Sequence, residues 1–183
     1  GCNDSRHDGI HAFHVGKNAN VTYAEKHYGE GEGTGEKILN PVTQIYLEEG
    51  AVFTLDTAQI GGVDSTVRKT EVYMEADSKL YVMEKLMTHD SQTAVSDMTV
   101  EMNGAGSSAQ IVSRSVAKGN SVQTFHPIAI GNALCHAHVQ CDSIIMDKAQ
   151  ISSIPEINAR DIDAQIIHEA AIGRINNEQI LKL

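Results

Sequence analysis

The 183-residue sequence has no tryptophan, and aromatic residues make up only 4% of it. Aliphatic side chains must therefore build most of any hydrophobic core. The printed chain has no apolar run approaching about 18 residues, and it shows no signal-peptide pattern. We therefore expect no membrane partner and a cytoplasmic location.

Cysteine and positive charge are also scarce. Three cysteines are too few, and odd in number, for the disulfide framework of a small secreted protein. Lys and Arg total 14 against 24 Asp and Glu, which gives a net charge of −10. Nucleic-acid binding needs a basic face, so we expect no nucleic-acid partner. The negative charge is compatible with attracting metal cations, although solubility explains it more simply.

The sequence does contain a repeat. Each copy has an alternating apolar run, a short turn of small or acidic residues, and a second alternating run. The copies are residues 12–23 (the loosest), 43–55, 70–82, 99–112 and 143–151. The anchors Ile45, Val72 and Val100 recur at a nearly constant interval, and Ile144 is interpreted as the anchor of the last copy.

Alternation marks strands that have one buried face. Strands that recur with a coil-length period can bury that face only by stacking coil on coil. We therefore predict an all-β fold, a parallel β-helix (solenoid) of about six to eight coils. A β-sandwich would need hairpin turns, and Asn103-Gly104 is the one strong signal for such a turn.

Two segments have the apolar spacing of a helix, residues 79–87 and 162–172. The repeat predicts strands at both places, and we follow the repeat. The alternating Gly and Glu of residues 29–36 cannot pack a core and predict a mobile loop. A phosphate-binding loop is disfavoured there, because the three glutamates would repel a phosphate.

We place the parallel β-helix core at residues 1–173. Residues 174–183 are assigned to the start of a C-terminal helical segment, capped by Asn176 or Asn177. Because the chain starts Gly-Cys without Met and stops at Leu183, we interpret it as a core fragment or a processed protein.

Six residues between 135 and 169 could bind a metal: Cys135, His136, His138, Cys141, His168 and Glu169. Thiolate, imidazole and carboxylate together suit a soft or borderline transition metal. On one strand Cys135 and Cys141 would share a face but lie about 20 Å apart, which disfavours a closed zinc site made from this run. Cys141 could instead meet His168 and Glu169 from a neighbouring part of the fold or from a second subunit.

Four motifs occur in order here: Gln-Cys-Asp-Ser at 140–143, Ile-Pro-Glu-Ile at 154–157, His-Glu-Ala at 168–170 and Asn-Glu-Gln-Ile-Leu at 177–181. In order and spacing they resemble the closing third of the SufB/SufD proteins, which are scaffold components of the SUF iron–sulfur cluster assembly machinery. The resemblance implies a right-handed parallel β-helix and a transient iron–sulfur cluster, with none necessarily bound to the isolated fragment. It also implies a SufC-like ATPase partner, and pairing as a homodimer or with a SufB/SufD-type partner.

By the same resemblance, Cys141 matches a cysteine that takes part in cluster assembly close to a partner's histidine. His168 and Glu169 match the adjacent His-Glu of SufB, whereas SufD-like members keep only the histidine, so the chain looks SufB-like. SufB proteins carry a further cysteine that is thought to receive sulfur. His27 stands at that position here, which leaves the sulfur donor unknown.

Cys135, His136 and His138 are weaker candidates. We interpret Cys135 as a core residue, while the two histidines could be exposed to solvent or could line a dimer contact.

The preferred hypothesis is a non-enzymatic scaffold that holds a nascent cluster at a subunit interface. The ATPase would be a separate partner, because the sequence has no Walker phosphate-binding motif. One alternative is a β-helix adaptor module without metal. A β-helix enzyme acting on polysaccharides is disfavoured, because only five Tyr and three Phe are available for sugar stacking.

Overall fold

The computed structural model describes residues 5–28, 36–61 and 63–176, and all regular structure in these residues is β-strand. The strands are β1 Ser5–Val15, β2 Asn20–Tyr28, β3 Lys37–Leu47, β4 Val52–Ile60, β5 Ser65–Met74, β6 Lys79–Thr88, β7 Thr93–Met102, β8 Ser107–Ala117, β9 Val122–Gly131, β10 Cys135–Met146, β11 Gln150–Ser153, β12 Glu156–Ala159 and β13 Ala164–Ile175. Among the described residues there is no helix that is long and apolar enough to cross a membrane.

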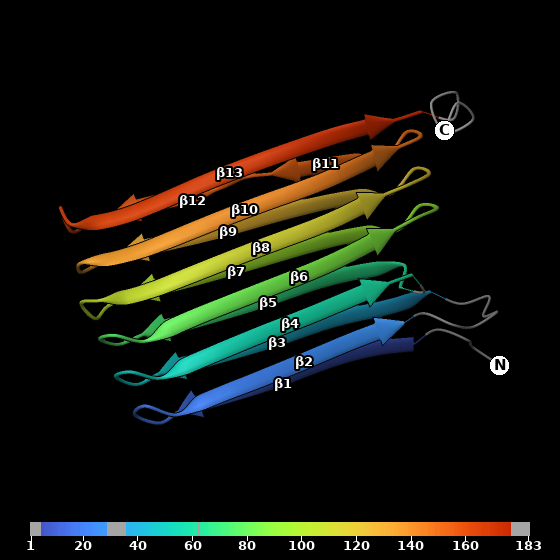
Figure 1. Cartoon of the computed structure of the whole chain (residues 1–183). Helices are drawn as coiled ribbons and strands as arrows, with labels where there is room; N and C mark the ends of the chain where they lie inside the picture. Colours follow the sequence, from blue (N-terminus) through green and yellow to red (C-terminus); the bar gives the residue numbers. More distant parts are fainter. Residues whose placement is uncertain (1–4, 29–35, 62, 177–183) are drawn as a thin grey trace.

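The chain alternates between two parallel sheets, as Figure 1 shows. Sheet A has the order β1-β3-β5-β7-β9-β11, with β12 also paired to β9, and sheet B has the order β2-β4-β6-β8-β10-β13. Six coils result, and they climb in a right-handed sense (Figure 1). This is the hand of about 98% of parallel crossover connections. The predicted right-handed parallel β-helix is confirmed.

The repeat anchors stack as predicted, with one exception. Ile45 pairs with Val72, and Val72 pairs with Val100 in the next coil. The fourth member of this column is Ala129, because Val100 pairs with it. The assignment of Ile144 to this column was wrong, since Ile144 belongs to β10 of sheet B. Residues 143–151 span a turn from sheet B to sheet A, whereas the other copies of the repeat span turns from sheet A to sheet B. Both kinds of turn have the same sequence pattern of strand, tight turn and strand.

The two segments with helical spacing are strands β6 and β13, as the repeat predicted. The predicted domain boundary after residue 173 falls inside β13, which continues to Ile175. The rest of the predicted helical segment, from residue 177, and residues 29–35 of the predicted loop lie outside the described residues.

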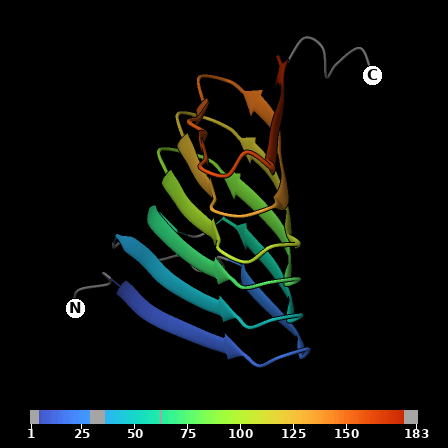
Figure 2. The same ribbon diagram turned by 90° about the vertical axis from the view of Figure 1, so that its left-hand side faces the viewer.

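The corners between each sheet A strand and the following sheet B strand lie one above another, and Figure 2 looks onto them. Four corner residues have positive φ: Asn18, Gly50, Asp77 and Gly106. The N–H of each donates to a carbonyl oxygen in the next corner at 2.8–3.0 Å. The Oδ1 atoms of Asn18 and Asp77 lie where a Cβ on Gly50 or Gly106 would be. Asn or Asp therefore alternates with Gly from corner to corner. Asn and Asp tolerate a positive φ, and Gly, which has no Cβ, leaves room for the Asn or Asp side chain of the corner before it.

The interior between the sheets has two halves. The half near these corners is apolar, and its buried side chains include Ile45, Leu47, Phe53, Val72, Met74, Leu80, Val100, Met102 and Ile111. The half at the opposite strand ends is polar, and its buried side chains include Thr57, Gln59, Thr66, Arg68, Glu84, Ser96, Ser113, Ser115, Gln123 and Ser143. Burial of the apolar half stabilises the stack, whereas the polar half must satisfy its hydrogen bonds internally.

The tightest corner yields a test of the coil stacking. A Cβ on Gly104 would lie 1.8 Å from the backbone nitrogen of Ala76, whereas a Cβ on Gly16 would meet only the Glu48 carboxylate, at 3.4 Å. We expect Gly104→Ala to destabilise the protein by about 3 kcal/mol, because two backbones must separate. Gly16→Ala is the matched control, with an expected change within about 0.5 kcal/mol. Urea unfolding followed by circular dichroism measures both, and equal midpoints for the two variants would contradict this stacking.

Candidate functional site

Cys141 and His168 come together on the adjacent strands β10 and β13. In register, Val139 pairs with His168 and Cys141 pairs with Ala170, so Cys141 and His168 both point into the coil. Cys141 Sγ lies 3.6 Å from His168 Nε2, and the Ser153 hydroxyl donates to the same sulfur at 3.9 Å. The thiol is only 5% exposed. A buried sulfur therefore has an imidazole nitrogen within contact distance in the same chain.

Cys141 is also the last polar member of a row that runs through the solenoid. Successive residues of this row pair in register from coil to coil, and we call Glu25, Thr57, Glu84, Ser113 and Cys141 the polar row. These side chains share the inner face of sheet B. The row therefore connects the first coil with the site at β10.

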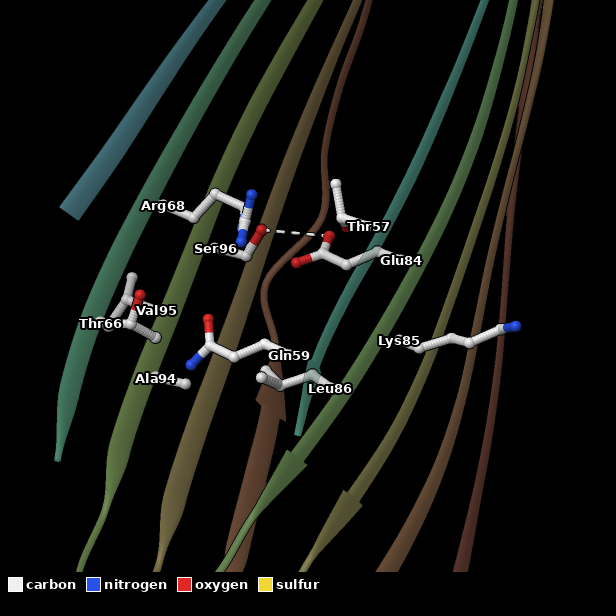
Figure 3. Close-up of a pocket in the computed structure, with 10 residues that line it drawn as sticks. All are labelled: Thr57, Gln59, Thr66, Arg68, Glu84, Lys85, Leu86, Ala94, Val95 and Ser96. Carbon is white, nitrogen blue, oxygen red and sulfur yellow. Dashed lines mark hydrogen bonds between the residues drawn. The ribbon is translucent and has the colours of Figure 1, made fainter. Parts of the chain in front are cut away.

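Arg68 lies opposite the polar row on sheet A. Its Nη1 is 3.4 Å from Glu25 Oε2, and Figure 3 shows its guanidinium directed toward Glu84. The Ser96 hydroxyl donates to Glu84 Oε2 at 3.3 Å (Figure 3). One buried cation thus faces two carboxylates, one in the first coil and one in the third.

The two carboxylates differ in their electrostatics. Burial opposes ionisation of Glu25, but the hydrogen bond from His27 and the charge of Arg68 hold the pKa of Glu25 below its ordinary value. Burial dominates at Glu84 and raises its pKa, although Arg68 and Ser96 act in the opposite direction. Of the two carboxylates, Glu84 is therefore the one for which a negative charge is costly.

A cavity of about 20 Å³ separates Glu84 from Cys141, and serine hydroxyls and the Gln123 side chain line it. This volume holds about one water molecule. Burial raises the pKa of the Cys141 thiol, the Ser153 hydrogen bond lowers it, and the charges of Glu84 and Asp142 raise it further. The net shift is upward, so the resting group is a thiol.

Glu169 lies on the opposite face of sheet B from Cys141 and His168. Its Oε2 is 3.4 Å from His138 Nε2 on the outer surface. His136 is exposed on that same face. The strands β10 and β13 thus carry a different contact on each face. The Cys141 thiol meets the His168 imidazole inside, and the His138 imidazole meets the Glu169 carboxylate outside.

Comparison with known families decides the assignment. A family profile described as "SUF system FeS cluster assembly, SufBD core domain" matches residues 7–133 and residues 63–181. The chain belongs to this SufBD family. The match confirms the family that the motifs resembled in the sequence.

Known SufBD relatives are longer than this chain. An iron–sulfur cluster assembly SufBD family protein of Methanocaldococcus jannaschii is 29% identical over 174 residues, 91% of this chain and 52% of that protein. One of Archaeoglobus fulgidus is 29% identical over 183 residues, covering 97% and 47%, and one of Pyrococcus horikoshii is 28% identical over 188 residues, covering 98% and 55%. The chain spans about half the length of these relatives.

The structure brings together only two of the three metal ligands that the SufBD motifs suggested. Cys141 and His168 meet, but Glu169 points away from both, because neighbouring residues on a strand face opposite ways. Within residues 5–28, 36–61 and 63–176, no group of three or more His, Cys, Asp or Glu side chains is arranged to hold a metal. A three-ligand site in this SufBD chain therefore stays a prediction that needs ligands from beyond these residues.

Cys135 packs in the apolar core cluster, as we interpreted it. His27 is hydrogen bonded to Glu25 in the first coil, next to the polar row. Sequence reasoning did not find that row. The sequence does contain Thr, Glu, Ser and Cys at inward positions one coil apart. These positions can be recognised as one row only when the register between strands is known.

Glu84 yields a prediction about pH. A raised native pKa means that the folded state holds its proton longer, so stability falls as pH rises from the ordinary value of 4.5 through the native pKa. Glu84→Gln removes this loss, and Arg68 keeps its contact with Glu25. We expect the variant to be more stable than the parent by about 1 kcal/mol near neutral pH and equal to it below pH 4.5. Urea unfolding at a series of pH values measures this, and a pH-independent difference would contradict it.

The resting state of Cys141 can be tested by alkylation. In a Cys2→Ser, Cys135→Ser background, the buried thiol should react with iodoacetamide at least about tenfold more slowly in the folded protein than in urea. The rate in the folded protein should increase with pH, because the thiolate is the reacting form. Equal rates in both states, measured by mass spectrometry, would show that the thiol is not enclosed.

Proposed function

We propose that this chain is a non-enzymatic scaffold component of SUF-type iron–sulfur cluster assembly, on which a nascent cluster is built and released. The observation that carries the proposal is the 3.6 Å contact between Cys141 Sγ and His168 Nε2. Membership of the SufBD family supports the same process. The cluster is the cargo of this scaffold, as opposed to a resident cofactor.

The geometry suggests how Cys141 is made ready for the cargo. A thiol must lose its proton before it binds iron. His168 Nε2 is placed to take that proton, which leaves a thiolate on Cys141 and an imidazolium on His168. The thiol is protonated at rest because it is buried, so it stays unreactive until iron stabilises the thiolate.

A second subunit would complete the site. β13 is the last strand of sheet B and has a described neighbour only on the β10 side. Several isoleucines at this end of the solenoid are exposed: Ile154, Ile157, Ile162, Ile167 and Ile172. Such an open strand edge favours pairing. The partner subunit of a homodimer, or a SufB/SufD-type partner, would bring further metal ligands to the site beside His168. Glu169 and His138 on the outer face are available to the same assembly.

The remaining parts of the assembly are also proposals. Energy would come from a SufC-like ATPase in the cytoplasm, because the chain has no phosphate-binding motif of its own. Glu169 beside His168 favours a SufB-like role. The sulfur donor would deliver to this chain without the usual accepting cysteine, since His27 occupies that position.

Anaerobic reconstitution tests the proposal. The parent chain, given ferrous iron and sulfide, should develop visible absorption from sulfur-to-iron charge transfer. Cys141→Ser should lose most of this absorption, because it removes the thiolate. His168→Gln should weaken iron retention by about tenfold, because it removes the neighbouring nitrogen.

Cys135→Ser is the matched control, since that sulfur lies in the apolar core on the same strand. It should reconstitute like the parent, provided that circular dichroism shows an intact fold. If Cys141→Ser and the parent give the same spectrum and iron content, the scaffold assignment fails and the metal-free adaptor is favoured.

A further inference from the structure

The last coil crosses sheet A differently from the earlier coils. Each earlier coil uses one strand of 10 or 11 residues there, whereas the last coil has the short strands β11 and β12 with two residues between them. Both pair with β9 in one continuous register, since Gln150 pairs with Val122 and Glu156 pairs with Ile128. The interruption between β11 and β12 is therefore not a shift in register.

The interruption has a cause in the sequence of β9. In the shared register Ile154 lies beside His126, and the Ile154 N–H donates to the Phe125 carbonyl at 2.8 Å. The return bond to the Ile154 carbonyl would come from the N–H of residue 127. That residue is Pro127, which has no N–H. The ladder therefore lacks a bond in the middle of this segment, where its backbone can open most easily.

The same segment forms the sheet A wall beside Cys141. The Ser153 hydroxyl donates to Cys141 Sγ at 3.9 Å, and Ile151 and Ser153 line one small cavity together with Cys141. In the described part of the chain β11 and β12 are the edge of sheet A, because they have a neighbour only on the β9 side. An outward movement of Ser153 would therefore open the cavity to solvent on this side.

One side chain of β9 holds this segment from the outer face of sheet A. His126 Nε2 lies 3.6 Å from Glu156 Oε2 on β12, and His126 Nδ1 lies 3.5 Å from Asp97 Oδ1 on β7. Carboxylate oxygens only accept hydrogen bonds, so both contacts are favourable when both ring nitrogens carry protons. All three side chains are partly exposed, so each ion pair is weak. A weak contact suits a segment that opens and closes again.

We propose that residues 153–156 are a hinged wall of the Cys141 cavity, and that the ion pair of His126 with Glu156 holds the wall closed. The hinge lies where Pro127 leaves the ladder bond unmade. His126 is a positioning residue, since it acts on Cys141 through β12 and Ser153. The inference stands on this geometry and does not require the proposed function. Within that function, the wall would control the access of iron or sulfide to Cys141.

Alkylation of Cys141 measures how often the wall opens. In the Cys2→Ser, Cys135→Ser background, His126→Gln should raise the rate of reaction with iodoacetamide in the folded protein about fivefold, because it removes both ion pairs. Glu156→Gln removes one of them and should raise the rate about twofold. His126→Lys keeps a cation between the two carboxylates and should react like the parent. The rate reports the open fraction, because the wall closes faster than the thiol reacts.

His14→Gln is the matched control. His14 Nε2 lies 3.5 Å from Glu48 Oε1, so the same kind of ion pair is removed in the first coil, and the alkylation rate should not change. Combining His126→Gln with Glu156→Gln should give the rate of His126→Gln alone, because the two side chains act through one contact. Equal rates for the parent and His126→Gln would overturn the proposal, and so would an equal rise in His14→Gln.

Two further measurements separate opening of the wall from unfolding of the whole chain. In hydrogen exchange followed by mass spectrometry, His126→Gln should raise exchange in residues 150–159 and leave β6 unchanged. The alkylation rate of the parent should change little in up to about 1 M urea, because a local opening exposes little surface. Faster exchange in every coil, or a steep dependence on urea, would overturn the proposal. No measurement here uses iron or sulfide, so its failure is distinct from failure of the reconstitution experiment.

Discussion

Every feature of this protein depends on parallel pairing between successive coils. Each strand is bonded to the strand one coil away, and the corners are bonded to each other as well, through residues such as Gly50 and Asp77. This pairing holds residues one coil apart directly above one another. A side chain on the inner face therefore contacts its equivalents in the coils before and after it. In such an array stability is approximately a sum over neighbouring coils.

The stacked coils enclose an interior with an apolar half and a polar half. Its apolar half supplies burial energy, with Phe53, Leu80 and Ile111 among the side chains that exclude water. Its polar half arranges charged and hydroxyl groups in rows, with Arg68 between two carboxylates and Cys141 at the far end. Buried polar groups are tolerated because each finds a partner, and no buried side-chain nitrogen or oxygen in the described part of the chain lacks one. Even within this network, burial makes a negative charge on Glu84 costly.

The candidate site follows from the last pair of strands in sheet B. β10 is covered on both sides, whereas β13 has only one described neighbour, so Cys141 is enclosed while His168 lies at an edge. This placement suits a group that stays protected until a partner or a metal arrives. It also separates the two histidine contacts, with His168 facing the thiol inside and His138 facing Glu169 outside. In the function that we propose, a cluster would draw on the inner pair of Cys141 and His168 and on ligands from a second subunit.

Strand alternation and the coil-length repeat are properties of the sequence, so the β-helix, the stacking of Ile45, Val72 and Val100, and the opposite orientations of His168 and Glu169 were all predictable. These follow from backbone geometry, in which neighbouring side chains on a strand always point to opposite faces. The placement of Ile144 was not predictable in this way, because the turns at the two ends of a coil look alike in sequence. The contact between Cys141 and His168 and the polar row both depend on the register between strands. That register is decided by which coils pack together, and only the folded chain reveals it.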